Sequence, residues 1–388
     1  MIKVVIWGCR DGEYLYQQMQ ESNACKYQVV AMADNASKYQ ETEIQGVPVI
    51  NLDILSKKYQ AGEVDKIIIT VRKGYSRYCI LKELQRSGIE ITDIILMRPS
   101  PFIFKLPICF DEENEIYNKQ WYFITEENKD TVIIHHLESN LADGCNLNCK
   151  GCLHFSNLYK RDDFPDEDAI LEGIKSIAGH CEVFQFRILG GEPLLNKNLP
   201  NFIMRLREIL PNTDIAIISN GILIPKTENV LFEVMKKCNV GFILTLYQPT
   251  LKMKDMIYNR LLENGVPYGS HEAKTELFEK FLLLEPESVD KHPYKACKPR
   301  GILVLKEQFL YRCPPVEAYI GKYCETYGVH MDIPDGIDVL DTDIKWDNLI
   351  DKLYTEPRSL CKYCSNKSDF YEWGNSKAEK MDWIVENK

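Results

Sequence analysis

Three cysteines within eight residues are the feature of this sequence most directly tied to chemistry. Cys145, Cys149 and Cys152 follow a C-x3-C-x2-C spacing in the stretch CNLNCKGC. A tight loop of three thiolates can ligate three irons of a [4Fe-4S] cluster and leave the fourth iron open to a small molecule. Zinc sites instead draw four ligands from paired clusters, and His154 is the only further candidate nearby in the sequence. The spacing therefore favours an iron–sulfur cluster over zinc or free buried thiols.

Four more cysteines in the last quarter of the chain form a second set, which consists of Cys297, Cys313, Cys361 and Cys364. The stretch GILVLKEQFLYRC predicts a β-hairpin that turns at Lys306-Glu307 and carries the first two of these cysteines towards each other. Four thiolates that converge from three segments suit a closed site, which holds either [4Fe-4S] or zinc. Cys324, in the same region, is interpreted as a small buried hydrophobic residue.

The elements around the first set predict repeated βα units from residue 131 onward. Apolar stretches at 131–140, 213–219 and 239–246 read as strands, as does the stretch leading into GGEP. The predicted helices lie at 167–179, 197–209, 226–237 and beyond 251. Units of this length close part of a barrel, and active residues in such folds lie at the carboxyl ends of the strands. The fold class predicted is therefore α/β.

Several motifs fall at those strand ends, namely Gly190-Gly191-Glu192-Pro193, Ser219-Asn220, Thr245 and Tyr247. Together with the cysteine triplet they resemble the radical S-adenosylmethionine superfamily. The resemblance implies that the open iron chelates the methionyl amino and carboxylate groups of S-adenosylmethionine, and that one electron cleaves this cofactor to a 5′-deoxyadenosyl radical. It also implies a partial (βα)6 barrel, a glycine motif that holds the amino group, and strand ends that touch the ribose and carboxylate. One position departs from the family pattern: Gly151 stands where an aromatic residue usually precedes the last cysteine.

The second cysteine set resembles the Twitch domain, the shortened form of the SPASM domain that follows the radical barrel. This resemblance favours an auxiliary [4Fe-4S] cluster over zinc. In radical dehydrogenases of this group, the auxiliary cluster receives the electron left on a substrate alcohol carbon after hydrogen-atom abstraction. Such an oxidation also needs a base for the hydroxyl proton. The candidates expected to face the barrel mouth are His154, Arg187, Tyr247 and Arg300, and no spacing selects among them.

The first 98 residues predict a separate Rossmann-like domain. Strands KVVIWG, YQVVAMAD and KIIITV alternate with helices, and Cys9-Arg10-Asp11-Gly12 reads as a turn before a helix that begins EYLYQQMQ. Only Gly8 and Gly12 are present of the three glycines that a dinucleotide fingerprint needs, which argues against NAD. The strand-glycine opening, the AMADN stretch and IQGVPVI resemble the nucleotide-sugar domain of sugar N-acetyltransferases. Nucleotide-sugar binding and a purely structural role both remain open.

Length and charge narrow the remaining possibilities. The 388 residues suit several domains, and the predicted boundaries are 1–98, a connector at 99–130, the radical barrel at 131–290 and the auxiliary domain at 291–388. A net charge of −10 without a basic stripe argues against nucleic acid. The absence of a long apolar run argues against a membrane span, so a cytoplasmic location is expected.

The sequence thus predicts a radical enzyme that acts on a carbohydrate, cyclitol or nucleotide-sugar-like substrate, most simply by oxidising a hydroxyl-bearing carbon. An external one-electron reductant such as flavodoxin or ferredoxin is the expected partner, besides the small-molecule substrate. The alternatives are a sugar epimerase or dehydratase, a peptide maturase, and a non-catalytic electron-transfer or scaffold protein. An intact glycine motif disfavours the last, because an electron carrier needs no cofactor cradle.

Overall fold

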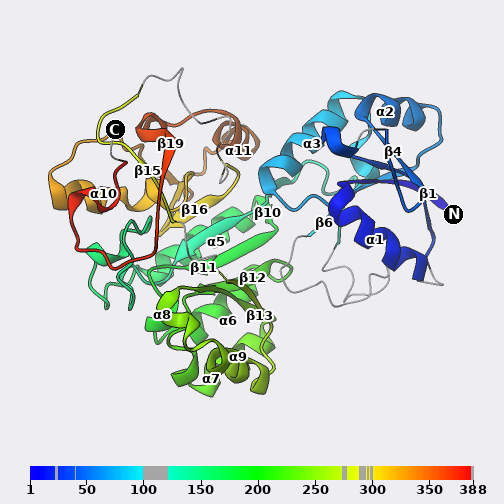
Figure 1. The fold of residues 1–388 in the computed structure, drawn as a ribbon. Coiled ribbons are helices and arrows are strands. Elements are labelled where there is room, and N and C mark those ends of the chain that lie inside the picture. The colour runs from blue at the N-terminus through cyan, green and yellow to red at the C-terminus, as the bar shows by residue number, and fades with distance from the viewer. Residues whose placement is uncertain are drawn as a thin grey trace. The chain divides into compact units, whose positions relative to one another are not determined.

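A computed structural model describes residues 1–21, 25–39, 41–98, 121–272, 278–287, 294, 297 and 300–385. Its contacts divide the chain into two compact units, Met1–Thr131 and Val132–Lys388 (Figure 1). The predicted connector at 99–130 lies mostly outside the described residues. Within the described residues, no helix is both long enough and apolar enough to cross a membrane.

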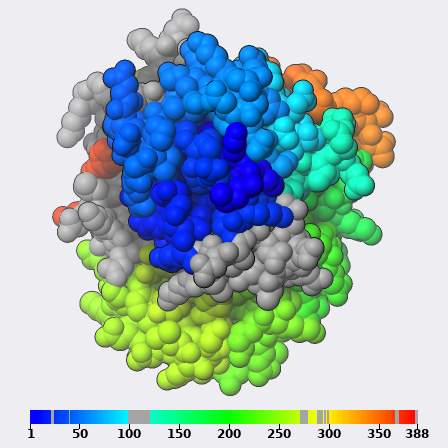
Figure 2. All heavy atoms as spheres, turned by 90° about the vertical axis from the view of Figure 1, so that its right-hand side faces the viewer, coloured from blue at the N-terminus to red at the C-terminus, as the bar shows by residue number. Residues whose placement is uncertain are grey.

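The first unit is one open, largely parallel sheet, drawn in blue to cyan in Figures 1 and 2. Its strands lie in the order β3-β4-β2-β1-β5-β6-β7, and the neighbours from β4 to β6 run parallel. Its elements are β1 (Ile2–Trp7), α1 (Cys9–Glu21), β2 (Tyr27–Ala33), β3 (Glu43–Ile44), β4 (Val47–Ile50), α2 (Leu52–Gln60), β5 (Lys66–Ile69), α3 (Gly74–Arg86), β6 (Ile94–Met97) and β7 (Trp121–Phe123).

Helix α1 begins four residues earlier than the sequence predicts. The expected turn at Cys9–Gly12 is already its first turn, and Gly8, at φ +110°, makes the reversal out of β1. The Asp34 carboxylate accepts a hydrogen bond from the Cys9 backbone N–H at 2.9 Å and so caps this helix. Asp34, which directly follows β2, therefore satisfies the helix N-terminus of its own chain.

The second unit contains an eight-stranded sheet in the order β14-β13-β12-β11-β9-β16-β17-β18. The six strands from β14 to β16 run parallel to their neighbours, and β17 and β18 continue the sheet antiparallel. The strands are β8 (Val132–Ile134), β9 (Leu137–Asn140), β10 (Cys181–Val183), β11 (Gln185–Leu189), β12 (Asp214–Ser219), β13 (Val240–Leu246), β14 (Tyr268–Glu272), β15 (Phe278–Leu282), β16 (Leu303–Lys306), β17 (Phe309–Tyr311), β18 (Ile337–Asp338) and β19 (Cys364–Tyr371). The helices are α5 (Glu167–Ala178), α6 (Leu199–Ile209), α7 (Asn229–Lys237), α8 (Gln248–Leu251), α9 (Lys254–Glu263), α10 (Val316–Tyr327) and α11 (Trp346–Thr355).

Two strand predictions need correction. The stretch 131–140 is not one strand, because β8 pairs with β10 while β9 pairs with β11 and β16 in the main sheet. The hairpin predicted before Cys313 is present as β16 and β17, but Lys306 pairs with Phe309. The turn therefore lies at Glu307-Gln308, one residue later than predicted, with Glu307 at φ 53°.

A shared aromatic core joins the cysteine loop to the end of the chain. The ring of Phe155, which follows the loop, lies 5.7 Å from Tyr323 of α10 and 5.8 Å from Trp383. Tyr323 and Trp383 also meet edge to face at 5.5 Å, and all three side chains are almost fully buried. Burying each such side chain stabilises the fold by about 1.5–3 kcal/mol. The last described residues are thus fixed against the segment that carries the first cysteine set.

Candidate active site

The first three cysteines lie together in the loop that follows β9. Burial, and then the nearby Glu192 and the other two thiols, raise the pKa of Cys145 to about 12. Burial also raises the pKa of Cys149 to about 11, against a hydrogen bond from Trp373. A buried thiol of this kind gives up its proton when a cation replaces it, and metal binding requires the thiolate form. With Cys152 in the same loop, the three cysteines therefore fit an iron–sulfur cluster.

Donor groups point at the sulfurs of this loop. The Leu147 backbone N–H lies 3.3 Å from the Cys145 Sγ atom, and the Trp373 indole N–H lies 3.2 Å from the Cys149 Sγ atom. Hydrogen bonds to cluster sulfurs are among the factors that set reduction potential. The contact from Trp373 was not predicted, because no sequence pattern links two residues 224 positions apart.

The C-terminal segment also fills the space beside Gly151. Gly151 has φ +64°, and a Cβ atom built there would lie 2.3 Å from the Tyr371 Oη atom. The Tyr371 hydroxyl donates a hydrogen bond to the Lys150 carbonyl at 2.7 Å, and the Trp383 indole donates to the Cys152 carbonyl at 2.8 Å. The position where the sequence departs from the family pattern is therefore occupied by an aromatic side chain from a distant segment.

Glu192 is a fully buried carboxylate at the end of β11. It accepts hydrogen bonds from the Ser219 hydroxyl at 2.8 Å, the Asn220 backbone N–H at 2.9 Å and the Leu194 backbone N–H at 3.2 Å. Burial raises the pKa of Glu192 to about 7, and these three donors partly oppose that rise. An ammonium group bound beside Glu192 would favour its carboxylate form. A buried carboxylate therefore fits the amino group of S-adenosylmethionine.

Two glycines let the strand end approach the cysteine loop. A Cβ atom on Gly190, which has φ +153°, would lie 2.2 Å from the Ala142 carbonyl oxygen, and one on Gly191 would lie 2.1 Å from that of Gly144. The Gly191 N–H donates to the Ala142 carbonyl at 2.7 Å, and the Glu192 N–H donates to the Gly144 carbonyl at 3.1 Å. The glycines are thus required for backbone contact between the two loops.

The remaining predicted cofactor residues lie in two places. Pro193 begins a 3-10 turn directly after Glu192, and Thr245 is the last residue but one of β13. These positions are at the carboxyl edge of the same parallel sheet, as predicted. Gly8 and Gly12 belong to the first unit, where added Cβ atoms would lie 2.8 Å from the Thr70 Oγ1 atom and 2.7 Å from the Ile6 Cγ2 atom. Their observed role is close packing of α1 against the sheet.

Of the four candidate bases, Arg187 lies in the middle of β11, and its side chain points towards the amino end of the neighbouring strand β12. Its Nη2 atom lies 2.7 Å from the Asp214 carboxylate, and its Nη1 atom donates to the Asp214 carbonyl at 2.8 Å. Asp214 is the first residue of β12, whereas Ser219 is the last. The prediction that Arg187 faces the barrel mouth is therefore wrong, and its buried ion pair is structural.

Tyr247, His154 and Arg300 occupy three different environments. Burial and then the three thiols of the first set raise the pKa of Tyr247, so its phenol stays protonated and can donate a hydrogen bond. Burial lowers the pKa of His154 to about 4, and its ring packs 6.1 Å from that of Tyr319 in α10. Arg300 lies beside the second cysteine set instead, where it donates to the Tyr294 carbonyl at 3.1 Å.

The structure brings the four cysteines of the second set together. Burial raises the pKa of Cys313 well above its usual value, and the thiols of Cys364, Cys297 and Cys361 add to this rise. Burial likewise raises the pKa of Cys364 to about 12, with Cys361 and Cys297 as further causes. The hairpin and the C-x2-C segment thus converge as predicted, and none of the four is fully exposed.

Within the described part of the chain, no three His, Cys, Asp or Glu side chains lie close enough together to hold a single metal ion.

Comparisons with known proteins address the region that carries the first cysteine set. Residues 139–252 match the family model described as the Radical SAM superfamily. The GTP 3',8-cyclase of Alkaliphilus oremlandii is 32% identical over 111 residues, which are 28% of this chain and 34% of that protein. The GTP 3',8-cyclase of Thermodesulfovibrio yellowstonii is 34% identical over 112 residues, with the same two shares. The match thus spans about a third of the length of these curated relatives.

The chain is also similar to the solved structure of BtrN in complex with AdoMet and 2-DOIA. That comparison covers 66% of this chain and 98% of BtrN at 19% identity, with a TM-score of 0.34. The family match and the site geometry agree on residues 139–252, which form a radical SAM domain. The domain is characteristic of a superfamily of enzymes that use a [4Fe-4S] cluster and S-adenosylmethionine.

Proposed function

We propose that this protein is a radical SAM oxidoreductase that oxidises a hydroxyl-bearing carbon of a carbohydrate, cyclitol or nucleotide-sugar-like substrate. The observation that carries the proposal is the second cysteine set, in which four partly buried cysteines lie near one another and would together ligate an auxiliary [4Fe-4S] cluster. A cluster with four protein ligands leaves no iron for substrate, so electron transfer is the function that remains for it.

The chain's own residues have separate tasks in this proposal. Cys145, Cys149 and Cys152 would hold the first cluster, and Glu192 would hold the amino group of S-adenosylmethionine. Ser219 and Asn220 orient Glu192 through the hydrogen bonds they donate to its two carboxylate oxygens. When bound, the cluster and S-adenosylmethionine supply the 5′-deoxyadenosyl radical that abstracts a hydrogen atom.

The overall oxidation breaks one C–H bond and one O–H bond of the substrate, and it removes one hydrogen atom, one proton and one electron. The substrate carbon loses a hydrogen atom to the deoxyadenosyl group, and the hydroxyl loses a proton to a base. A cluster held by the second cysteine set would accept the remaining electron as the C=O bond forms. An external one-electron reductant such as flavodoxin or ferredoxin would start the cycle.

The sugar-like substrate class rests on the resemblance of residues 1–98 to a nucleotide-sugar domain. The parallel order of β4, β2, β1, β5 and β6 supports that assignment, whereas the capping of α1 by Asp34 disfavours a phosphate at that helix. We therefore expect the first unit either to bind the substrate at a surface other than the N-terminus of α1 or to have a structural role.

The test is anaerobic turnover with a panel of aminocyclitols and UDP-sugars, each deuterated at the hydroxyl-bearing carbons. We expect a product three mass units lighter than the deuterated substrate, or two units lighter when the substrate is unlabelled. One deuterium should appear in 5′-deoxyadenosine, and one S-adenosylmethionine should be consumed per turnover. Cys361→Ala should stop product formation while some cofactor cleavage continues. Cys324→Ala is the matched control, because Cys324 lies in α10 outside the second set, and it should keep activity. A product of unchanged mass would indicate epimerisation and would remove the electron-acceptor role.

A further inference from the structure

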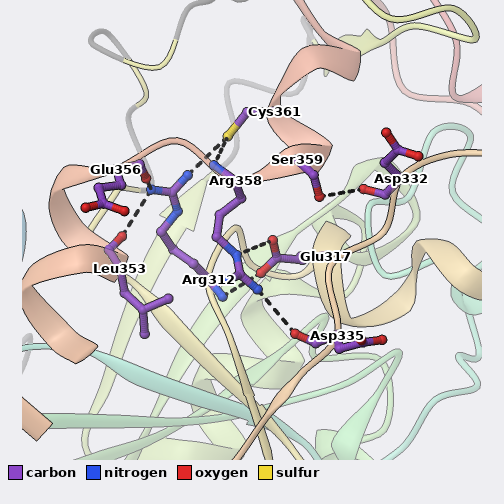
Figure 3. A network of polar contacts seen from close by, with 9 residues as sticks. All are labelled: Arg312, Glu317, Asp332, Asp335, Leu353, Glu356, Arg358, Ser359 and Cys361. Carbon is purple, nitrogen blue, oxygen red and sulfur yellow. Dashed lines mark hydrogen bonds and ion pairs between the residues drawn. The ribbon is translucent and has the colours of Figure 1, made fainter. Parts of the chain in front are cut away.

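Arg312 is a buried cation that contacts a cysteine of the second set. It follows β17, directly precedes Cys313, and is only 3% exposed. Its Nη2 atom lies 3.1 Å from the Cys361 Sγ atom, and its Nη1 atom donates to the Leu353 carbonyl at 3.0 Å and to the Glu356 carbonyl (Figure 3). The hydrogen bonds that Arg312 donates to these groups therefore fix the orientation of its guanidinium group.

The guanidinium has no carboxylate counterion among the described residues. The nearby buried carboxylate, Glu317, forms an ion pair with Arg358 at 3.0 Å and accepts a hydrogen bond from the Arg312 backbone N–H at 2.8 Å (Figure 3). Arginine stays protonated in proteins, and a buried charge is costly unless an anion compensates it. The sulfur of Cys361 is the group that can supply this negative charge.

The two cysteine sets thus receive different side-chain donors. In the first set the neutral indole of Trp373 faces Cys149, and Trp373 is half-buried. In the second set a buried cation faces Cys361. A positive charge at a cluster sulfur stabilises the reduced state, which carries one more negative charge, and the effect is large where water is excluded.

We propose that Arg312 is a positioning residue that raises the reduction potential of the second cluster and so makes it the electron acceptor. This inference rests on the proposed function, because it requires a cluster at the second site. It predicts that the charge and direction of the Arg312 side chain, and not only the four cysteines, determine the direction of electron flow.

The experiment is a redox titration of the anaerobic, cluster-loaded protein, monitored by electron paramagnetic resonance. Arg312→Gln should lower the potential of the second cluster by at least about 59 mV, a tenfold change in the ratio of oxidised to reduced cluster for a one-electron couple. Arg312→Lys keeps a charge but cannot reach the sulfur and both carbonyls together. We therefore expect a smaller shift in potential, equivalent to a change of about threefold in the ratio of oxidised to reduced cluster. The potential of the first cluster should not change in either variant.

Lys362→Gln is the matched control. Lys362 is adjacent to Cys361 in sequence and is also cationic, but it is more exposed and its ammonium pairs with Asp332. Water screens this charge, so the control should leave the potential unchanged.

Each outcome decides the proposal. A second cluster with the wild-type potential in both Arg312 variants would overturn it, even if oxidised product still forms. If Arg312→Gln binds no iron at the second site, an unchanged potential in Arg312→Lys overturns it. Zinc at the second site would overturn both this inference and the auxiliary-cluster function, and metal analysis distinguishes that result from the others.

Discussion

The clearest test of the cofactor site is the replacement of Glu192 by glutamine. The carboxylate is fully buried, and its pKa is raised to about 7 because burial penalises the charged form. If it pairs with the amino group of S-adenosylmethionine, the bound state favours ionisation and binding requires loss of the proton. Affinity should then weaken as the pH falls through about 7.

The size of the effect follows from this pKa. A group with a pKa of about 7 is roughly nine-tenths ionised at pH 8 and one-tenth ionised at pH 6, so the dissociation constant should be about tenfold larger at pH 6. Glu192→Gln removes the charge and one acceptor oxygen. The loss of a charged hydrogen bond should weaken binding by about 1.5–3 kcal/mol at pH 8, and the pH dependence should disappear.

Anaerobic calorimetry of the cluster-loaded protein at several pH values measures both effects. The amino group of S-adenosylmethionine also titrates. Because the glutamine side chain does not ionise, any pH dependence that remains in the variant belongs to the ligand and can be subtracted. Iron content and circular dichroism must match the wild type, so that lost affinity is not lost structure. Wild-type affinity in the variant, or an identical pH dependence, would show that Glu192 only anchors the turn through Ser219 and Asn220.

Three further predictions concern the clusters and their loop. Anaerobic protein should contain about eight iron atoms, and about four after the first three cysteines are replaced by alanine, with S-adenosylmethionine cleavage lost; iron analysis that finds no difference contradicts this. Trp373→Phe should lower the reduction potential of the first cluster by roughly 40 mV, the equivalent of about 1 kcal/mol for a one-electron couple, because it deletes the N–H donor to Cys149 and keeps the ring; a redox titration in which the first cluster keeps its wild-type potential contradicts this. Gly190→Ala should destabilise the fold by more than about 2 kcal/mol, because its Cβ would lie 2.2 Å from the Ala142 carbonyl oxygen, whereas the helical control Gly321→Ala, with nothing within 4 Å, should be neutral or stabilising in thermal unfolding.

The sequence alone was sufficient for the α/β class and for placing the candidate residues of the first site. Apolar strands alternating with amphipathic helices predict a parallel sheet, because only that arrangement buries both the strands and the helix faces. Cys145, Cys149 and Cys152 are close in sequence, and a parallel sheet gathers strand ends at one edge, so Glu192 and Ser219 could be placed beside them. Local pattern and one topological rule thus placed these residues together, and the resemblance to the radical SAM superfamily supplied their expected roles.

Only the tertiary structure decided which distant groups act on the sulfurs. Trp373 reaches Cys149 and Tyr371 fills the space beside Gly151 because an aromatic core fixes the C-terminal segment against the cysteine loop. Arg312 contacts Cys361 across 49 residues, and Arg187 pairs with Asp214 at the amino end of the neighbouring strand β12. Such contacts depend on side-chain direction and on packing between segments that are far apart in the chain. Residue types and spacings carry no information about either, so the two cysteine sets could be recognised in the sequence, whereas the groups that contact their sulfurs could not.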